Sequence, residues 1–258
     1  MTTSGQLVLT SIQNLPIIKE DDDLGSMIFN HAQKQSIGFE DGDIIVMAQK
    51  IVSKSEGRLR DLREVKPGLR ARFIARKVQK DARLVELILQ ESNKVLRAKN
   101  GKLIVEHKKG FVCANAGIDH SNAIGGDDSS HFVLLLPEDA DRSASKIRSV
   151  LELKTGKKIG VLIIDSHGRA WRTGTTGTTI GVAGVPALVD LRGTPDLFGY
   201  RLRITQVAAA DELAAGASLM MGQAAEGTPC IHVRGFPYQM RESGLGELIR
   251  NKNKDLFR

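Results

Sequence analysis

The sequence predicts an α+β fold in which helices pack on mixed sheets, and three observations support this class. Short apolar runs typical of strands alternate irregularly with longer segments of helical periodicity, which argues against a regular parallel α/β fold. The chain contains no internal repeat and no low-complexity tract. Its 258 residues can bury a substantial core, and no clear linker divides them. We therefore expect one unit over residues 1–258, with two lobes as the alternative arrangement.

The composition is that of an ordinary globular protein, because 41% of the residues are hydrophobic and 26% are charged. A net charge of +7 favours anionic partners but does not distinguish polymers from small phosphorylated molecules. Aromatic residues make up only 4% of the chain, which leaves little for bases of single-stranded nucleic acid to stack on.

Cys113 and Cys230 each lie in an apolar run, and we interpret both as buried thiols of a reducing compartment. The N-terminus lacks the basic and apolar regions of a secretory signal. No apolar run approaches the roughly 20 residues of a membrane span. We therefore expect a cytoplasmic protein without a membrane partner.

Two strands and a helix are expected in the first 60 residues. Residues 6–12 alternate like a strand, and the acidic run 20–23 precedes a helix, where N-capping is favoured over metal binding. The apolar, Pro-containing stretch 15–18 is expected to line a pocket. Residues 43–48 predict a strand that enters a polar loop carrying Lys54. Lys54 lies between two serines and could hold a phosphate, although lysines at strand ends are commonly only solvated.

Residues 69–97 have the apolar periodicity of helices, and the pattern predicts two helices that break near Lys80. Acidic residues interrupt the basic outer face, which we interpret as solvated surface and not as a nucleic-acid stripe. A hairpin of strands 102–106 and 110–114 leads to NAGIDHSN, where Asp119 follows a short apolar element. An aspartate in such a turn is usually a cap.

The most informative stretch covers residues 161–184. Four apolar residues predict a buried strand that ends at Asp165, followed by a Gly- and Thr-rich loop with Arg169 and Arg172. Guanidinium groups can bind an anion, and a Gly-rich backbone can come close to it. A carboxylate can bind a cation beside that anion. Asp119 and Asp165 are therefore candidate ligands of a hard cation in a phosphate site. Their spacing with the neighbouring histidines matches no zinc motif.

The rest of the chain supplies further elements and one more candidate loop. The expected elements are a flexible loop at 122–131, strands at 132–137, 202–207 and 230–233, helices at 141–156 and 211–221, and a terminal helix at 243–258. The loop 222–229 carries Gln223 and Glu226, whose oxygens could complete a hard-cation site.

Six motifs occur in order: LPIIKEDDDL, DGDIIVMAQKIVSKSEGR, NAGIDHSN, LLLPEDAD, IIDSHGRAWRTG and MGQAAEGTP. With this collinear set the chain resembles the coenzyme F420:L-glutamate ligase (gamma-glutamyl ligase) family from about residue 15 to residue 235. The set is more specific than any single glycine pattern. The resemblance implies an α+β fold of the gamma-glutamyl ligase type.

The resemblance also implies a reaction. In this family GTP activates the terminal carboxylate of the phosphate-linked deazaflavin precursor of coenzyme F420, through an expected acyl phosphate. The amine of L-glutamate then attacks, and further glutamates can be added through the gamma carboxylate. The implied cofactors are Mg²⁺ or Mn²⁺, with K⁺ as an additional cation, and the implied assembly is a homodimer.

Site residues follow from the resemblance position by position. The metal positions match Asp119, Asp165, Ser166 and Gln223. The nucleotide positions match Leu15, Pro16, Ile17, Ile18, Gln49, Lys50, Lys54, Asn122 and the phosphate-proximal loop Met221, Gly222, Gln223, Ala224, Ala225, Glu226, Gly227 and Thr228. Phosphoryl transfer needs metals and fixed positive groups more than a protein nucleophile. The expected catalytic residues are therefore Asp119, Asp165, Arg169 and Arg172.

Two alternatives stay open at this point. An amide ligase that uses another nucleotide or another acid acceptor would share the same site. A basic nucleic-acid-binding module is supported by the net charge alone and lacks a recognisable binding motif.

Overall fold

The computed structural model describes residues 5–99, 101–123 and 129–256. Residues 124–128 of the loop expected at 122–131 lie outside the described residues.

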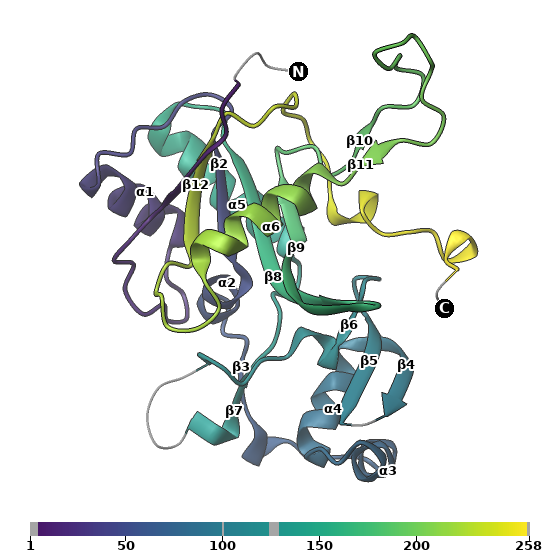
Figure 1. Ribbon diagram of the computed structural model, residues 1–258. Helices are drawn as coiled ribbons and strands as arrows, with labels where there is room; N and C mark the ends of the chain where they lie inside the picture. The colour runs from purple at the N-terminus through teal and green to yellow at the C-terminus, as the bar shows by residue number, and fades with distance from the viewer. Residues whose placement is uncertain (1–4, 100, 124–128, 257–258) are drawn as a thin grey trace.

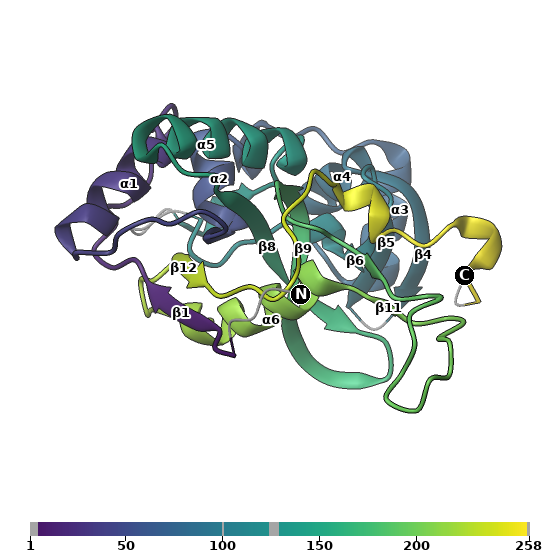
Figure 2. The ribbon, with the colours of Figure 1, turned by 90° about the horizontal axis from the view of Figure 1, so that it is seen from above.

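Five strands form the central sheet in the order β1-β12-β2-β8-β9 (Figures 1 and 2). Their bounds are Val8–Ser11 for β1, Cys230–Arg234 for β12, Ile44–Ala48 for β2, Gly160–Arg169 for β8 and Arg172–Ala183 for β9. β2 and β8 are parallel, with Ala48 opposite Ile164, and the other neighbouring pairs are antiparallel. The mixed sheet confirms the predicted α+β class. It also places the carboxyl end of β2 beside Ile164, in the middle of β8.

Helices cover both faces of this sheet, as the turned view shows (Figure 2). Ile45 and Met47 of β2 face a core built with helices α1, Leu24–Lys34, α2, Gln49–Ser55, and α5, Ala140–Thr155. Ile44 and Val46 face the opposite core, built with α6, Ala209–Met221. Successive side chains of a strand point to opposite faces of the sheet. Because every residue of β2 is apolar, the strand can be buried on both faces.

Several predicted helix ends are confirmed. Asp23 caps α1, because its carboxylate accepts a hydrogen bond from the Ser26 N–H. Gly156 ends α5 in the left-handed conformation at φ 67°. The helix expected at 211–221 is α6.

A third core lies in the part of the chain between β3 and β7, drawn at the bottom of Figure 1. Helices α3, Leu69–Val78, and α4, Ala82–Gln90, pack against a sheet of β4, Ser92–Lys99, β5, Lys102–His107, and β6, Val112–Ala114. The break predicted near residue 80 is confirmed, since Gln79 ends α3 in the left-handed conformation and Asp81 caps α4. The short strands β3, Leu59–Asp61, and β7, Phe132–Leu134, pair with each other.

Four local predictions were wrong. Residues 92–97 are not helical, because they pair with β5 as β4. Residues 49–55 form helix α2 and not a polar loop. β8 does not end at Asp165 but continues to Arg169 and pairs with the Thr-rich segment, so the expected glycine loop is a β-hairpin. The tail contains 3₁₀ turns at Leu245–Glu247 and Lys252–Lys254 and no α-helix among its described residues.

Residues 189–207 form an arm that extends from the body at the upper right of Figure 1. Only its base is regular, where β10, Val189–Asp190, pairs with β11, Gln206–Val207. The strand predicted at 202–207 is therefore confirmed only at its end. None of the helices in the described part of the chain is both long and apolar enough to cross a membrane.

Candidate functional site

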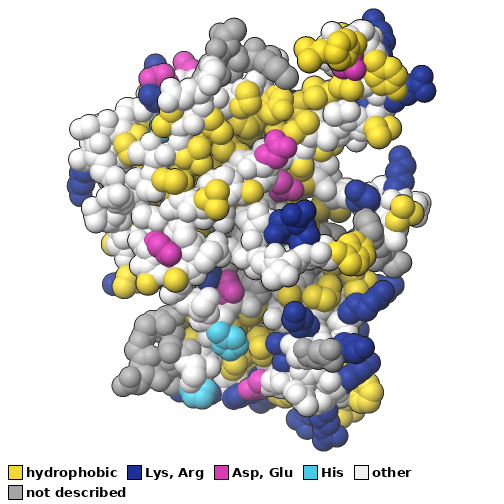
Figure 3. All heavy atoms as spheres, viewed as in Figure 1, with side chains coloured by type: hydrophobic (Ala, Val, Ile, Leu, Met, Phe, Trp, Pro, Cys, Tyr) yellow, Lys and Arg dark blue, Asp and Glu magenta, His cyan; other side chains and the backbone are white. Residues whose placement is uncertain are grey.

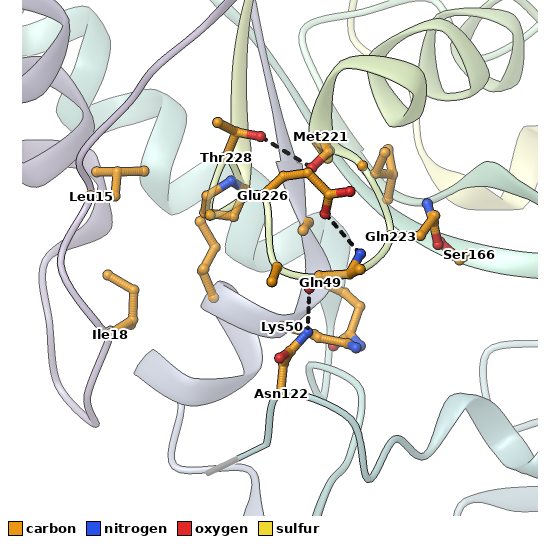
Figure 4. Close-up of a pocket in the computed structure, with 18 of the residues that line it drawn as sticks. Leu15, Ile18, Gln49, Lys50, Asn122, Ser166, Met221, Gln223, Glu226 and Thr228 are labelled. Atoms are coloured by element: carbon orange, nitrogen blue, oxygen red, sulfur yellow. Dashed lines mark hydrogen bonds between the residues drawn. The ribbon is translucent and has the colours of Figure 1, made fainter. Parts of the chain in front are cut away.

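A cavity of about 410 Å³ opens at the carboxyl end of β2, beside Ile164, Asp165 and Ser166 of β8 (Figure 4). Its walls contain all the residues predicted to bind a nucleotide, namely Leu15, Pro16, Ile17, Ile18, Gln49, Lys50, Lys54, Asn122 and the eight residues from Met221 to Thr228. Asp165 and Ser166 also line it. Segments that are far apart in the sequence therefore meet here. The expectation that residues 15–18 line a pocket is confirmed.

Asp119 is held beside the cavity by backbone pairing with β7. Its N–H donates to the Leu134 carbonyl at 3.0 Å, and its own carbonyl accepts from Leu134 N–H at 2.8 Å. Gln49 Nε2 donates to Asp119 Oδ2 at 3.2 Å, and Lys50 Nζ lies 3.3 Å from the same oxygen. Ser53 Oγ donates to Gln49 Oε1, which keeps the amide NH₂ directed at the carboxylate.

The pKa of the Asp119 carboxyl is raised above its ordinary value. Burial is the main cause, and the negative charge of Asp165 adds to it, while Lys50 and Gln49 act in the opposite direction. A charge that raises the pKa of another carboxyl in this way lies close to it. Asp119 and Asp165 are therefore brought together, as the sequence predicted.

Asp165 lies within β8, opposite Thr178 of β9, and only 10% of its side chain is exposed. His167 Nε2 lies 3.0 Å from Asp165 Oδ2. This nitrogen nevertheless makes no hydrogen bond of acceptable geometry with any described residue. The contact is therefore a close approach without an aligned hydrogen bond.

Ser166 and Gln223 form a second polar pair on the same wall. Ser166 Oγ donates to Gln223 Oε1 at 2.8 Å, and Gln223 Nε2 donates to Ser218 Oγ at 3.1 Å. Figure 4 shows Ser166 and Gln223 side by side, one from β8 and one from the loop after α6. Ser218, in the last turns of α6, also lines the cavity and was missed by the sequence analysis. Helical spacing from Met221 could have indicated it.

The four predicted metal residues present only oxygen donors: two neighbouring carboxylates, a hydroxyl and an amide carbonyl. Hard divalent cations such as Mg²⁺ and Mn²⁺ prefer this chemistry. No group of three or more His, Cys, Asp or Glu side chains among the described residues is arranged to hold a metal. The donor set therefore fits a cation that is shared with ligand oxygens and does not fit a closed protein cage.

The loop after α6 is folded back on itself. Gly222, at φ 72°, turns the chain, and Glu226 accepts a hydrogen bond from Ala224 N–H at 2.8 Å. Asn122 Nδ2 donates to the Ala224 carbonyl at 3.1 Å, and Thr228 Oγ1 donates to the Met221 carbonyl at 3.1 Å. The Glu226 carboxylate is thus engaged in shaping the loop. This makes it a poorer candidate cation ligand than Gln223.

The two lysines of α2 differ in their partners. Lys50 Nζ contacts Asp119 and donates to the carbonyl and hydroxyl oxygens of Ser121. The Lys54 ammonium makes no hydrogen bond or ion pair with any described residue. Its pKa is lowered by burial and by the charge of Lys50. A half-buried cation without a partner is suited to hold an anion in the cavity.

Comparisons with known proteins identify the family of this chain. The family model described as F420-0:Gamma-glutamyl ligase matches residues 13–235. The chain belongs to this family. It is 42% identical to the coenzyme F420:L-glutamate ligase of Methanothermobacter thermautotrophicus over 97% of this chain and 98% of that protein. It is also 41% identical to the ligase of that name from Methanopyrus kandleri (98% and 100% covered) and 42% identical to that from Archaeoglobus fulgidus (96% and 94%).

Membership of the F420-0:gamma-glutamyl ligase family confirms the resemblance drawn from the six motifs. One predicted pair lies elsewhere in this family member. Arg169 and Arg172 are opposite each other at the exposed tip of the β8–β9 hairpin and do not line the cavity. The two arginines lie away from the cavity because this segment is a hairpin and not a loop. β8 continues past Asp165 and carries Arg169 four residues further along the strand.

Proposed function

We propose that this chain catalyses the reaction named in its relatives and joins L-glutamate by an amide bond to the terminal carboxylate of the phosphate-linked deazaflavin precursor of coenzyme F420. The observation that carries the proposal is one cavity lined by Asp165, Ser166 and Gln223, with Asp119 bonded to its lining residues Gln49 and Lys50. The chain also matches the family over residues 13–235. Further gamma-glutamyl addition is part of the proposal.

GTP is the proposed co-substrate. The apolar residues Leu15 and Ile18 line the end of the cavity away from Gln223 and Ser166 (Figure 4), which suits a nucleoside. Lys54 and the folded loop after α6 suit its phosphates, because phosphate binds to cations and to backbone N–H groups. Guanine and ribose are then held apart from the reacting γ-phosphate.

The proposed chemistry has two steps. A carboxylate oxygen of the precursor attacks the γ-phosphorus of GTP, which forms an acyl phosphate and releases GDP. The uncharged amine of L-glutamate then attacks the acyl carbon, the C–O bond to phosphate breaks, and the amine loses a proton. In both steps the protein acts by positioning and by charge, since no protein nucleophile is required.

Asp119, Asp165, Ser166 and Gln223 would hold Mg²⁺ or Mn²⁺, and K⁺ is proposed as a further cation. When bound, such a cation neutralises charge on the phosphate oxygens during transfer. Gln49 and Lys50 hold the Asp119 carboxylate in place. Arg169 and Arg172 remain proposed catalytic groups, and from the hairpin tip they would have to act on ligand that extends out of the cavity.

A homodimer is the proposed assembly. The arm at residues 189–207 exposes Leu197 by 97%, Phe198 by 95% and Ile204 by 87%. Large apolar side chains concentrated on one projecting segment are typical of an interface. Light scattering of the purified protein would measure the mass, and a monomer at all concentrations would contradict the assembly.

The test of function is mass spectrometry of products. The purified protein is incubated with deazaflavin precursor, L-glutamate, Mn²⁺ and either GTP or ATP. We expect one or more glutamyl mass additions with GTP and stoichiometric release of GDP and phosphate. Product formation with ATP alone would support another nucleotide, and no product with either nucleotide would contradict the proposal.

A thermal-shift experiment separates the nucleic-acid alternative. GTP with Mn²⁺ is expected to raise the melting temperature, because a ligand of the folded state stabilises it. Stabilisation by an oligonucleotide and not by GTP with Mn²⁺ would favour the basic binding module.

A further inference from the structure

Helix α3 presents a surface that the proposed active site does not use. Ala71, Ala75 and Val78 are buried against the third core, whereas Leu69 is 86% exposed and Phe73 is 73% exposed. At about 100° per residue, Leu69 and Phe73 lie only about 40° apart on the side of the helix opposite the core. The exposed side chains Arg70, Arg72, Arg76 and Lys77 lie on both sides of them. We call these six residues the α3 face.

The α3 face carries four cations and no acidic residue. Nearby acids are engaged in other contacts: Asp81 pairs with Arg83, Glu91 pairs with Arg58, and Glu86 accepts from Gly68 N–H. None of the four cations forms an ion pair with a described residue. The sequence of residues 69–97 predicted one basic surface interrupted by acids. The structure places the interrupting acids in α4 and at the two positions that cap it, and leaves α3 with basic residues as its only charged side chains.

More cations surround this face. Lys94, Arg97 and Lys99 of the edge strand β4 are exposed, and Lys66 precedes α3. The space-filling view shows Lys and Arg side chains gathered at the lower right of the molecule, over the part that contains α3 and β4 in Figure 1 (Figure 3). The net charge of +7 is thus concentrated in part on one side of the protein.

We propose that the α3 face docks on the surface of an anionic lipid bilayer. A helix side with large apolar residues flanked by Lys and Arg lies in the headgroup region, where the apolar groups enter the acyl boundary and the cations meet lipid phosphates. The complementary charge supplies attraction, and Leu69 and Phe73 supply insertion. This is peripheral docking and requires no membrane-spanning helix.

Two other occupants fit less well. A nucleic acid would match the cations, but it gains from aromatic platforms and would leave an exposed leucine in water. A second copy of the chain, related by a twofold axis, would place this cationic face against itself, and like charges repel. The combination of Leu69 and Phe73 with the four cations therefore favours lipid.

Co-sedimentation of the full-length protein with vesicles tests the proposal. Vesicles of phosphatidylcholine alone are compared with vesicles that also contain phosphatidylglycerol, at low and high salt. We expect binding to the anionic vesicles and release by salt. Arg76→Gln and Lys77→Gln should each weaken the apparent affinity by about fivefold, and the double variant Leu69→Ala, Phe73→Ala by at least about tenfold.

Matched control variants are available on helices α5 and α1, which pack on the central sheet. Leu153→Ala removes an apolar side chain that is 85% exposed on α5, and Lys34→Gln removes an exposed cation of α1. Neither control should change vesicle binding. Circular dichroism checks that each variant is folded.

Several results would overturn the proposal. They are equal binding to both kinds of vesicle, an equal effect of the control variants, or no vesicle binding at all. Salt-sensitive binding of a short RNA that depends on Arg76 but not on Phe73 would assign the face to nucleic acid. A change of molecular mass in the Leu69→Ala, Phe73→Ala variant, seen by light scattering, would assign it to a contact between copies.

Discussion

An aspartate lies near each end of strand β2, and the two differ in how fully other protein groups compensate the negative charge. Just before the strand, Asp43 is 1% exposed and is fully partnered by Arg234, by His232 and by the Glu40 N–H. Just after the strand, Gln49 and Lys50 contact Asp119, whose carboxyl still carries a raised pKa. One cluster is satisfied within the protein, and the other is not.

The pKa values show the same contrast. Burial alone would raise the pKa of Asp43, but its hydrogen bonds with Arg234 and His232 outweigh burial and lower the pKa to about 2. At Asp119 burial and the Asp165 charge prevail over Lys50. A satisfied buried carboxylate stabilises the fold, whereas two neighbouring carboxylates that repel each other are suited to a cation. We therefore expect the Asp43 cluster to determine stability and the Asp119 cluster to determine activity.

The largest expected effect is that of Asp165→Asn. The substitution keeps the shape of the side chain but removes one of the two negative charges proposed to hold the cation. We expect glutamate addition to fall by about 10³-fold or more, because a metal supplies several kcal/mol of transition-state stabilisation. The melting temperature should stay near that of the wild type. Near-normal glutamate addition by the folded variant would remove Asp165 from the site.

Asp43→Asn should produce the reverse pattern. It leaves the buried His232 and the Arg234 guanidinium without their carboxylate, and breaking a buried charge pair costs about 3 kcal/mol or more. Urea denaturation measures this loss. The rate per folded molecule should be unchanged, because Asp43 lies at the far end of β2 from the cavity. A large fall in that rate with little loss of stability would invert the comparison.

The acid stability of the wild type depends on the same carboxylate. The folded-state pKa of Asp43, about 2, lies below its ordinary value of 3.8. Its contribution, roughly 2 kcal/mol, is therefore complete above about pH 4 and is lost as the pH falls from about 4 to 2. Urea midpoints measured across this range should fall steeply for the wild type and less steeply for Asp43→Asn. Parallel curves for the two proteins would contradict the assignment.

Local sequence signals were sufficient for most of the fold. The apolar run of β2, the acidic cap of α1 and the break between α3 and α4 all have short-range physical causes, and all were predicted. The β8–β9 hairpin was missed because threonine favours strands while glycine indicates loops, and the sequence contains both. Its turn also holds Trp171 at φ 58°, a conformation that a bulky residue rarely adopts.

The site depended on longer-range information. Residue chemistry alone selected Asp119 and Asp165, but their proximity results from the parallel pairing of β2 with β8 and from the bridge between Asp119 and Leu134. Residues 49–55 were predicted as a loop because the N-cap residue Ala48 has no side chain that could cap helix α2, so the sequence lacks the usual signal for a helix start. The resemblance, and not local pattern, selected most of the cavity residues.

The smallest expected effect concerns Lys54, which lies near the Asp119 cluster but contacts none of its carboxylates. Lys54→Ala should weaken GTP binding by about tenfold, the loss of one hydrogen bond to a charged group. The effect should appear in the apparent affinity for GTP and leave the rate at saturating GTP nearly unchanged. Lys34→Ala, at an exposed lysine of α1, is the matched control and should leave the affinity unaltered. Calorimetric titration with GTP and Mn²⁺ measures both variants. Equal affinities would mean that an unpaired, half-buried cation in the cavity wall does not meet the nucleotide, and the comparison between the ends of β2 would then rest on the carboxylates alone.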